Sequence, residues 1–128
     1  MEVSYFTKLK LSIYIIGVYI FSFFMFSFFS FENILKKIKN VNIKNTKKLI
    51  HEDKIFFYER YIANKLNVKK CFISCICLFI IFRKHGFDPK FCIGIRKRDK
   101  IESHSWIELN NKYFLLREGA NFQKILKI

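Results

Sequence analysis

Proline and glycine are scarce in this chain, which has one proline and four glycines among its 128 residues. Disordered segments are rich in these residues and poor in aromatic ones. Here aromatic residues make up 19% of the chain and apolar residues 52%. The composition therefore predicts a folded chain with an apolar core, and the length fits one small domain plus an appendage.

Acidic residues are also few, since 10 Asp and Glu oppose 24 Lys and Arg and leave a formal net charge of +14. Proteins that bind nucleic acids neutralise phosphates with clustered basic side chains. Here the lysines are spread from Lys8 to Lys127, and the sequence has no zinc finger, basic zipper or aromatic-plus-basic strip. We therefore predict no nucleic-acid partner.

The cysteines lack the spacing of a zinc site or of a disulfide framework. Three of them fall within seven residues of one expected helix, and the fourth is distant: Cys71, Cys75, Cys77 and Cys92. Neighbours on one helix are poorly placed to bridge each other, and Cys-x3-Cys-x-Cys departs from zinc-ligand spacings. We expect no metal, no cofactor and a reducing compartment such as the cytosol.

Charge is absent from Leu11 to Phe31, a stretch long enough at about 20 residues to cross a bilayer. Residues 11–31 are therefore a candidate membrane segment, and a helix packed on the domain is the alternative. No signal-peptidase site follows the stretch. Lysines after it outnumber Lys8 and Lys10, so a spanning helix would leave the rest of the chain in the cytosol.

The sequence divides near residue 50, with a hydrophobic helix and basic linker in 1–50 and a catalytic domain in 51–128. Apolar residues recur at helical intervals between Glu52 and Leu66, which predicts an amphipathic helix. Residues 71–84 are apolar on every side and end at His85-Gly86, as expected of a central helix with a glycine cap.

Short β-branched or aromatic segments follow this central helix. They are separated by charged or Asn-rich turns and predict three antiparallel strands, at Lys90–Ile95, Ser103–Leu109 and Tyr113–Leu116. The fold class is therefore α+β, with the central helix packed on a small antiparallel sheet.

Cys71 is the candidate nucleophile. It follows Lys69 and Lys70 at the start of the central helix, where the helix dipole, unpaired N–H groups and ammonium charges favour a thiolate. The other cysteines lie deeper in apolar sequence and are expected to be core residues.

A nucleophilic thiol needs a base, and His51, His85 and His104 are the histidines present. His51 falls in the linker, and His85 is about 20 Å from Cys71 at the far end of the same helix. His104 lies on a strand that can be placed opposite the helix start, so it is the candidate base.

A third group should orient the imidazole. Glu108 shares the strand face of His104 but lies about 13 Å along it, which is too far for a hydrogen bond. A three-residue hairpin loop over Asn110–Lys112 would pair His104 with Glu118, with Cβ atoms about 5 Å apart. A two-residue loop would place Arg117 there instead.

Four motifs between Cys71 and Glu108 occur at a specific spacing: Cys71-Phe72, Arg83-Lys84-His85-Gly86, Ile93-Gly94-Ile95 and His104-Ser105-Trp106-Ile107-Glu108. In these motifs the chain resembles the transglutaminase-like cysteine peptidases that remove leader peptides in lasso-peptide biosynthesis, the family of the microcin-processing maturation protein. The resemblance extends over residues 51–128. The chain departs from the family's pattern at two positions. Cys75 stands where serine is common, and Glu118 stands for the acidic third residue, which is usually Asp.

The resemblance implies a papain-like core in which Cys71 attacks the leader peptide, His104 is the base and Glu118 orients it. It also implies a precursor peptide, a separate leader-recognition protein and a cyclase resembling asparagine synthetase as partners. Long helical sequence at the start is typical of the family and favours a packed helix over a membrane span. Two other functions stay open: an acyl transferase with the same triad, and a non-catalytic membrane-anchored scaffold.

Overall fold

The computed structural model describes residues 5–43, 50–68, 71–97, 99–116 and 122–128. Its elements follow the order expected of an α+β protein. They are α1 (Tyr5–Phe28), α2 (Phe31–Lys39), α3 (Glu52–Lys65), α4 (Cys71–Lys84), β1 (Lys90–Lys97), β2 (Ile101–Leu109), β3 (Lys112–Phe114) and β4 (Gln123–Lys127). The predicted fold class is confirmed, and α3 and α4 match the two helices predicted for the second part of the chain.

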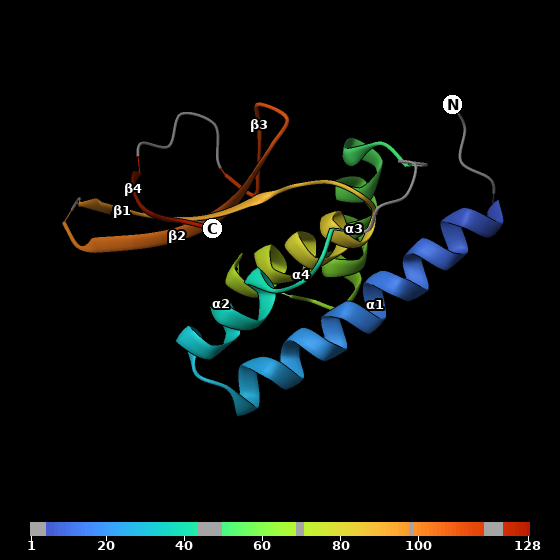
Figure 1. The fold of residues 1–128 in the computed structure, drawn as a ribbon, viewed down its shortest axis with the longest axis horizontal. Helices are drawn as coiled ribbons and strands as arrows, with labels where there is room; N and C mark the ends of the chain where they lie inside the picture. The colour runs from blue at the N-terminus through green and yellow to red at the C-terminus, as the bar shows by residue number, and fades with distance from the viewer. Residues whose placement is uncertain (1–4, 44–49, 69–70, 98, 117–121) are drawn as a thin grey trace.

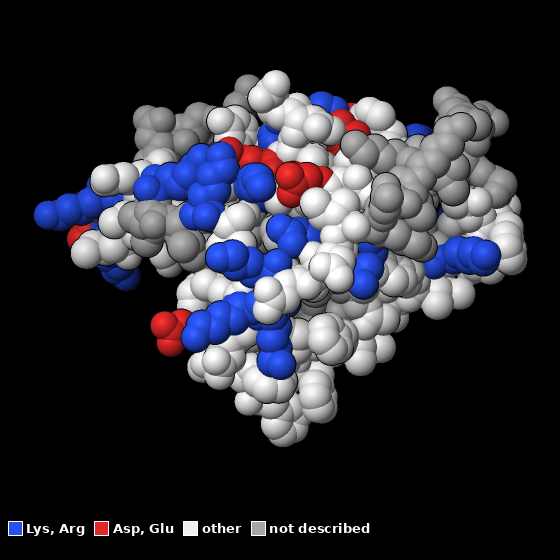
Figure 2. Space-filling view, viewed as in Figure 1, with Lys and Arg blue, Asp and Glu red and all other residues white. Residues whose placement is uncertain are grey.

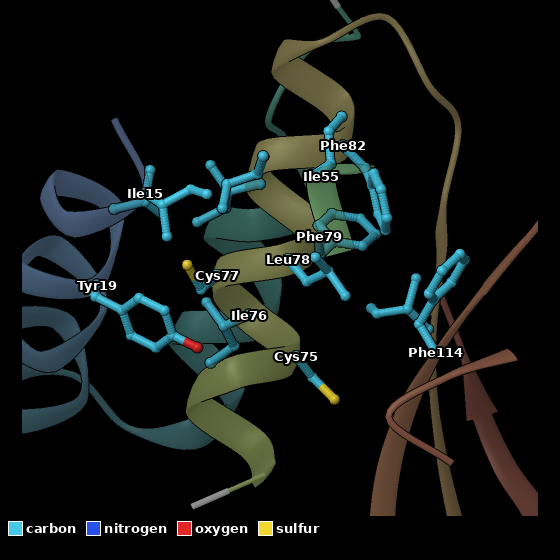
Figure 3. Packing of buried hydrophobic residues seen from close by; sticks show 14 of the residues in the cluster. Ile15, Tyr19, Ile55, Cys75, Ile76, Cys77, Leu78, Phe79, Phe82 and Phe114 are labelled. Carbon is cyan, nitrogen blue, oxygen red and sulfur yellow. The ribbon is translucent and has the colours of Figure 1, made fainter. Parts of the chain in front are cut away.

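The helix α4 lies between the sheet and the N-terminal helix α1 (Figure 1). Its side chains from Ile73 to Phe82 are all buried, as expected of a helix that is apolar on every side. Phe79 packs against Phe91 of β1, and Phe82 packs against Phe114 of β3. On the opposite side of α4, Cys77 points toward Tyr19 of α1 (Figure 3). A central helix between two layers therefore forms the core.

The sheet has the strand order β3-β2-β1-β4, and all its pairs are antiparallel. The first three strands form the predicted meander. The fourth strand was not predicted, and it pairs with the free edge of β1, where Ile128 and Phe91 exchange backbone hydrogen bonds of 2.8 and 3.1 Å. The strand β4 therefore forms one edge of the sheet, next to β1.

The hairpin between β2 and β3 has the shorter of the two loops that the sequence left open, with two residues and not three. Leu109 pairs with Lys112, and Asn110 and Asn111 have φ of 51° and 63°. Two successive left-handed residues make a type I′ turn, which suits the twist of a hairpin and which asparagine tolerates. The register that paired His104 with Glu118 therefore does not form, and Glu118 itself lies outside the described residues.

The expected long hydrophobic N-terminal helix is α1, and a second helix, α2, forms in the stretch that was expected to be linker. The helix α1 ends at Phe28, and the hydroxyl of Ser30 caps α2 by accepting a hydrogen bond of 3.4 Å from the backbone N–H of Asn33. By length and composition α1 could cross a membrane, and 33% of its most apolar window is buried against the domain.

A buried polar network fixes α1 to the domain. The Tyr19 hydroxyl donates a hydrogen bond to Glu59 of α3 and lies 2.9 Å from the Ser74 hydroxyl of α4. Arg60 pairs with both carboxylate oxygens of Glu59 at 2.7 Å. Burial and the neighbouring carboxylate of Glu59 raise the pKa of Tyr19, which keeps its hydroxyl protonated. The N-terminal helix is thus held by directional bonds in addition to apolar contact.

We expect Tyr19→Phe to lower the free energy of unfolding by about 1–3 kcal/mol, because it removes one of the donors to a buried carboxylate oxygen and a partner of the buried Ser74 hydroxyl. Urea denaturation measures the change. Tyr5→Phe is the control, since Tyr5 is in the same helix and 81% exposed. Equal unfolding free energies for the two variants would contradict the role of the network.

Candidate active site

Cys71 is the first residue of α4, as predicted, and its side chain lies outside the described part of the chain. The first turn of a helix has N–H groups without intrahelical partners, and the dipole of the helix places positive potential there. A thiol at this position is therefore in an environment that favours its thiolate. The adjacent residue, Phe72, is half-buried.

The remaining cysteines are core residues, as predicted. Cys75, Cys77 and Cys92 are buried, and none of them is in a disulfide. Burial and the carboxylate of Glu59 raise the pKa of Cys77, and burial and a contact with Glu108 raise the pKa of Cys92 to about 12. Both groups are thus thiols at neutral pH, and the assignment of Cys71 as nucleophile stays a prediction.

His104 lies in β2 opposite Gly94 of β1. Its Nε2 donates a hydrogen bond of 2.7 Å to the carbonyl oxygen of Leu115, and its ring stacks on Phe122 with centroids 5.4 Å apart. Leu115 has a φ of 67°, which is uncommon for leucine and turns the chain away after β3. The imidazole is therefore held toward the segment that follows β3.

Side chains alternate along β2, so His104 and Trp106 lie on one face of the sheet and Ile107 on the other. Ile107 is in the core with α4, as is Phe91 of β1. The imidazole thus projects from the face opposite to the one that α4 covers. Because the side chain of Cys71 lies outside the described part of the chain, its pairing with His104 stays a prediction.

On the face of the imidazole, Gly94 allows two aromatic rings to approach the backbone. A Cβ atom at Gly94 would lie 2.6 Å from the ring of Trp106 and 2.9 Å from Cβ of Phe122, so any other residue would displace them. The Ile-Gly-Ile motif therefore has a packing role. Sequence analysis noted the motif but gave it no function.

The other two histidines have structural partners. His51 is the N-cap of α3, where its Nδ1 accepts a hydrogen bond of 3.2 Å from the backbone N–H of Asp53. His85 follows α4, with its Nδ1 2.8 Å from the carbonyl oxygen of Ile81. Within the described residues, no group of three His, Cys, Asp or Glu side chains is placed to hold a metal ion.

A cavity of about 470 Å³ connects the start of α4 to β2. Three phenylalanines from three different helices line it together with residues of β1 and β2: Phe26, Phe31, Phe72, Ile93, Ser103, His104 and Ser105. Sequence analysis missed this cavity because two of its aromatic residues come from the apolar stretch before residue 50. It brings Phe72, the residue next to Cys71, beside β2 at His104, whose imidazole projects from the other face of the sheet.

Glu108 holds β4 against the rest of the sheet. Its Oε2 accepts hydrogen bonds from Lys124 at 2.6 Å, Trp106 Nε1 at 3.1 Å and Cys92 Sγ at 3.2 Å. Partial burial acts to raise the pKa of Glu108, but these bonds outweigh it and lower the pKa to about 2. Glu108 is thus engaged away from His104, in agreement with its rejection as the orienting acid.

We expect Glu108→Gln to lower stability in a pH-dependent way. The folded-state pKa lies below the unfolded value of about 4.3, so the stabilisation is present above that pH and lost as the pH falls toward 2. Unfolding free energies measured from pH 2 to 6 should differ by about 1–3 kcal/mol at pH 6 and converge at pH 2. Glu102→Gln, which removes an exposed pair with Arg96, should cost less than about 1 kcal/mol.

Comparison with known proteins gave one match. A family model described as the transglutaminase-like superfamily matches residues 58–127, which is more than half of the chain. The matched region begins within α3 and contains α4 and the four strands, and therefore both Cys71 and His104. No curated protein and no solved structure matches the chain.

Proposed function

The chain belongs to the transglutaminase-like superfamily, and from this premise we propose that it is a cysteine peptidase that removes the leader peptide from a ribosomally made precursor of the lasso-peptide type. The observation that carries the proposal is the superfamily match over residues 58–127, because it contains a cysteine at a helix start and the motif from His104 to Glu108. The four motifs between Cys71 and Glu108 support the narrower assignment.

In the proposed reaction the Cys71 thiolate attacks the carbonyl carbon at the end of the leader. The C–N bond then breaks, the amine leaves with a proton from His104, and the leader stays on sulfur as a thioester. Water activated by His104 hydrolyses this thioester. Backbone N–H groups of the first turn of α4 can bind the developing oxyanion, and Glu118 is assigned the role of orienting the imidazole.

A non-catalytic scaffold is the second candidate, and one observation favours it. The imidazole of His104 projects from the sheet face opposite to α4 and is bonded to Leu115. Catalysis requires the imidazole to reach the start of α4, whereas a scaffold places no such demand on it. The two functions differ in whether the side chain of Cys71 is needed for product formation.

We expect Cys71→Ala and His104→Ala to reduce leader cleavage at least about 1000-fold, because each removes a partner in one chemical step. Glu118→Ala should have a smaller effect, since only orientation is lost. Mass spectrometry of a precursor co-expressed with its leader-recognition protein measures the cleavage. Cys75→Ser is the matched control, as it changes a buried cysteine one turn further along α4.

The masses of the products distinguish the remaining possibilities. Hydrolysis splits the precursor and adds one water, whereas acyl transfer joins the leader to an amine with no added water. Full product formation by Cys71→Ala would contradict the peptidase and the transferase together and leave the scaffold.

The proposed partners are a precursor peptide, a leader-recognition protein and a cyclase resembling asparagine synthetase. The charge of the chain supports an acidic peptide as substrate. Lys and Arg side chains gather over the sheet and α2, with few acidic ones among them (Figure 2). A basic surface raises the local concentration of an acidic peptide and its rate of encounter.

We also propose that the protein works in the cytosol at a membrane surface, with α1 lying in the interface and not spanning it. One side of α1 is fixed to the domain through Tyr19, while large apolar side chains such as Ile13, Phe21 and Phe24 are exposed on it. Lysines flank this surface in the first turns of α1 and in α2. An apolar helix face beside basic residues is typical of interfacial binding to anionic lipid.

Vesicle flotation tests this placement. Purified protein should float with phosphatidylcholine vesicles that contain phosphatidylglycerol, and the double variant Phe21→Glu, Phe24→Glu should float at least about tenfold less. Phe57→Glu is the control, because Phe57 is a phenylalanine with a similar exposure, 63%, on a different helix, α3. Flotation that resists alkaline carbonate would indicate a spanning helix and contradict the interfacial placement.

A further inference from the structure

The cavity at the start of α4 is lined mainly by aromatic rings. Phe72 stacks on Phe31 of α2 with ring centroids 4.8 Å apart, and it lies 6.1 Å from the ring of Phe26 of α1. Ile93 continues this apolar wall on β1, and the lining includes no Asp, Glu, Lys or Arg. The lining of the cavity is therefore suited to an apolar ligand.

The aromatic residues are available to a ligand. Phe26 is 40% exposed and Phe31 is 49% exposed, although both are large apolar side chains next to the core. Burying such rings against another apolar group is favourable at roughly 25 cal/mol per Å². The volume of about 470 Å³ falls within the range of about 300–1,000 Å³ typical of ligand pockets.

The cavity is also preformed. Tyr19 fixes α1 to Glu59 and Ser74. Arg83 at the end of α4 donates hydrogen bonds of 2.9 and 2.7 Å to the carbonyl oxygens of Lys39, the last residue of α2, and of Val41 just after it. The hairpin of α1 and α2 is therefore held at both ends. A cavity whose walls are already in place loses little conformational entropy when a ligand binds.

We propose that this cavity is a specificity subsite that takes a large apolar side chain of the substrate, aromatic or branched aliphatic, within two residues of the scissile bond on its acyl side. The inference rests on the proposed function, because it takes the Cys71 thiolate as the attacking group. Phe72 is the residue after Cys71, so the cavity lies within one helical turn of the attacking residue, a distance that one or two peptide residues span. The α1–α2 hairpin, which lies outside the superfamily match, thus selects the substrate.

Three chloromethyl ketones test the subsite with the full-length protein. They are acetyl-Gly-Gly, acetyl-Gly-Phe and acetyl-Phe-Gly chloromethyl ketone, in which the sulfur of Cys71 bonds to the methylene carbon and chloride leaves. Peptide mapping by mass spectrometry gives the rate of alkylation at Cys71, and each rate is divided by that of free N-acetylcysteine. We expect at least one phenylalanine probe to react about tenfold faster than the Gly-Gly probe, the ratio that burial of an aromatic ring supports.

Two variants assign this preference to the cavity. Phe31→Ser opens one aromatic wall, and Ser103→Trp fills the space with a ring; each should reduce the preference to less than about threefold. Phe21→Ser is the matched control, because Phe21 is 53% exposed on α1 and does not line the cavity. It should leave the preference unchanged.

Iodoacetamide separates the failure of the subsite from the failure of the proposed function. It has no side chain, so it should alkylate Cys71 equally in the wild type and in all three variants. Alkylation of Cys71 by iodoacetamide with equal rates for the three ketones would overturn the subsite and leave the peptidase in place. A Cys71 that is no more reactive than N-acetylcysteine toward iodoacetamide would overturn the nucleophile, and the subsite with it.

Discussion

The hydrogen bonds of Tyr19 to Glu59 and Ser74 determine how the N-terminal half of the molecule is arranged. The helix α1 is apolar on nearly every side, so hydrophobic burial alone does not select which side faces the domain. A buried polar pair does, because any other rotation of α1 would leave the Tyr19 hydroxyl without its partners and remove a donor from the buried carboxylate of Glu59. Phe26 lies seven residues, or about two turns, after Tyr19 and therefore on the same side of the helix. The orientation set by one hydroxyl thus places an aromatic wall of the cavity.

Sequence reasoning succeeded where local signals decide the structure and failed where distant contacts decide it. Helical periodicity, an acidic first turn and a glycine cap located α3 and α4 to within a residue. The break before α2 had a local signal, the capping Ser30, that the apolar composition of the surrounding stretch concealed. The strand β4 had none, because its lysines and isoleucine resemble a solvated tail. Its pairing with β1 depends on Glu108, which holds Lys124 from another part of the chain.

The same distinction between local and distant signals holds for the candidate site. The position of Cys71 at a helix start and the rejection of Glu108 both followed from spacing along single elements. Spacing did not predict the register of the hairpin. The choice between two and three loop residues depended on whether Asn110 and Asn111 both adopt left-handed φ. The cavity was beyond prediction, since its residues come from five elements and meet only after α1 and α2 fold back on α4.

The shortness of β3 bears on whether His104 can act as a base. Because β3 pairs with β2 only at Ile107, Glu108 and Leu109, no described strand covers β2 on that side at His104. Within the described residues the edge of β2 is therefore open at His104, and the imidazole Nε2 points to that side through the carbonyl of Leu115. A side chain in the middle of a closed sheet would have to cross a neighbouring strand to reach the opposite face, whereas at an open edge it has only to pass around the backbone. Composition predicts none of this: the two-residue turn sets the register, and Leu115 ends the pairing three residues short of His104 by turning the chain away at a φ of 67°.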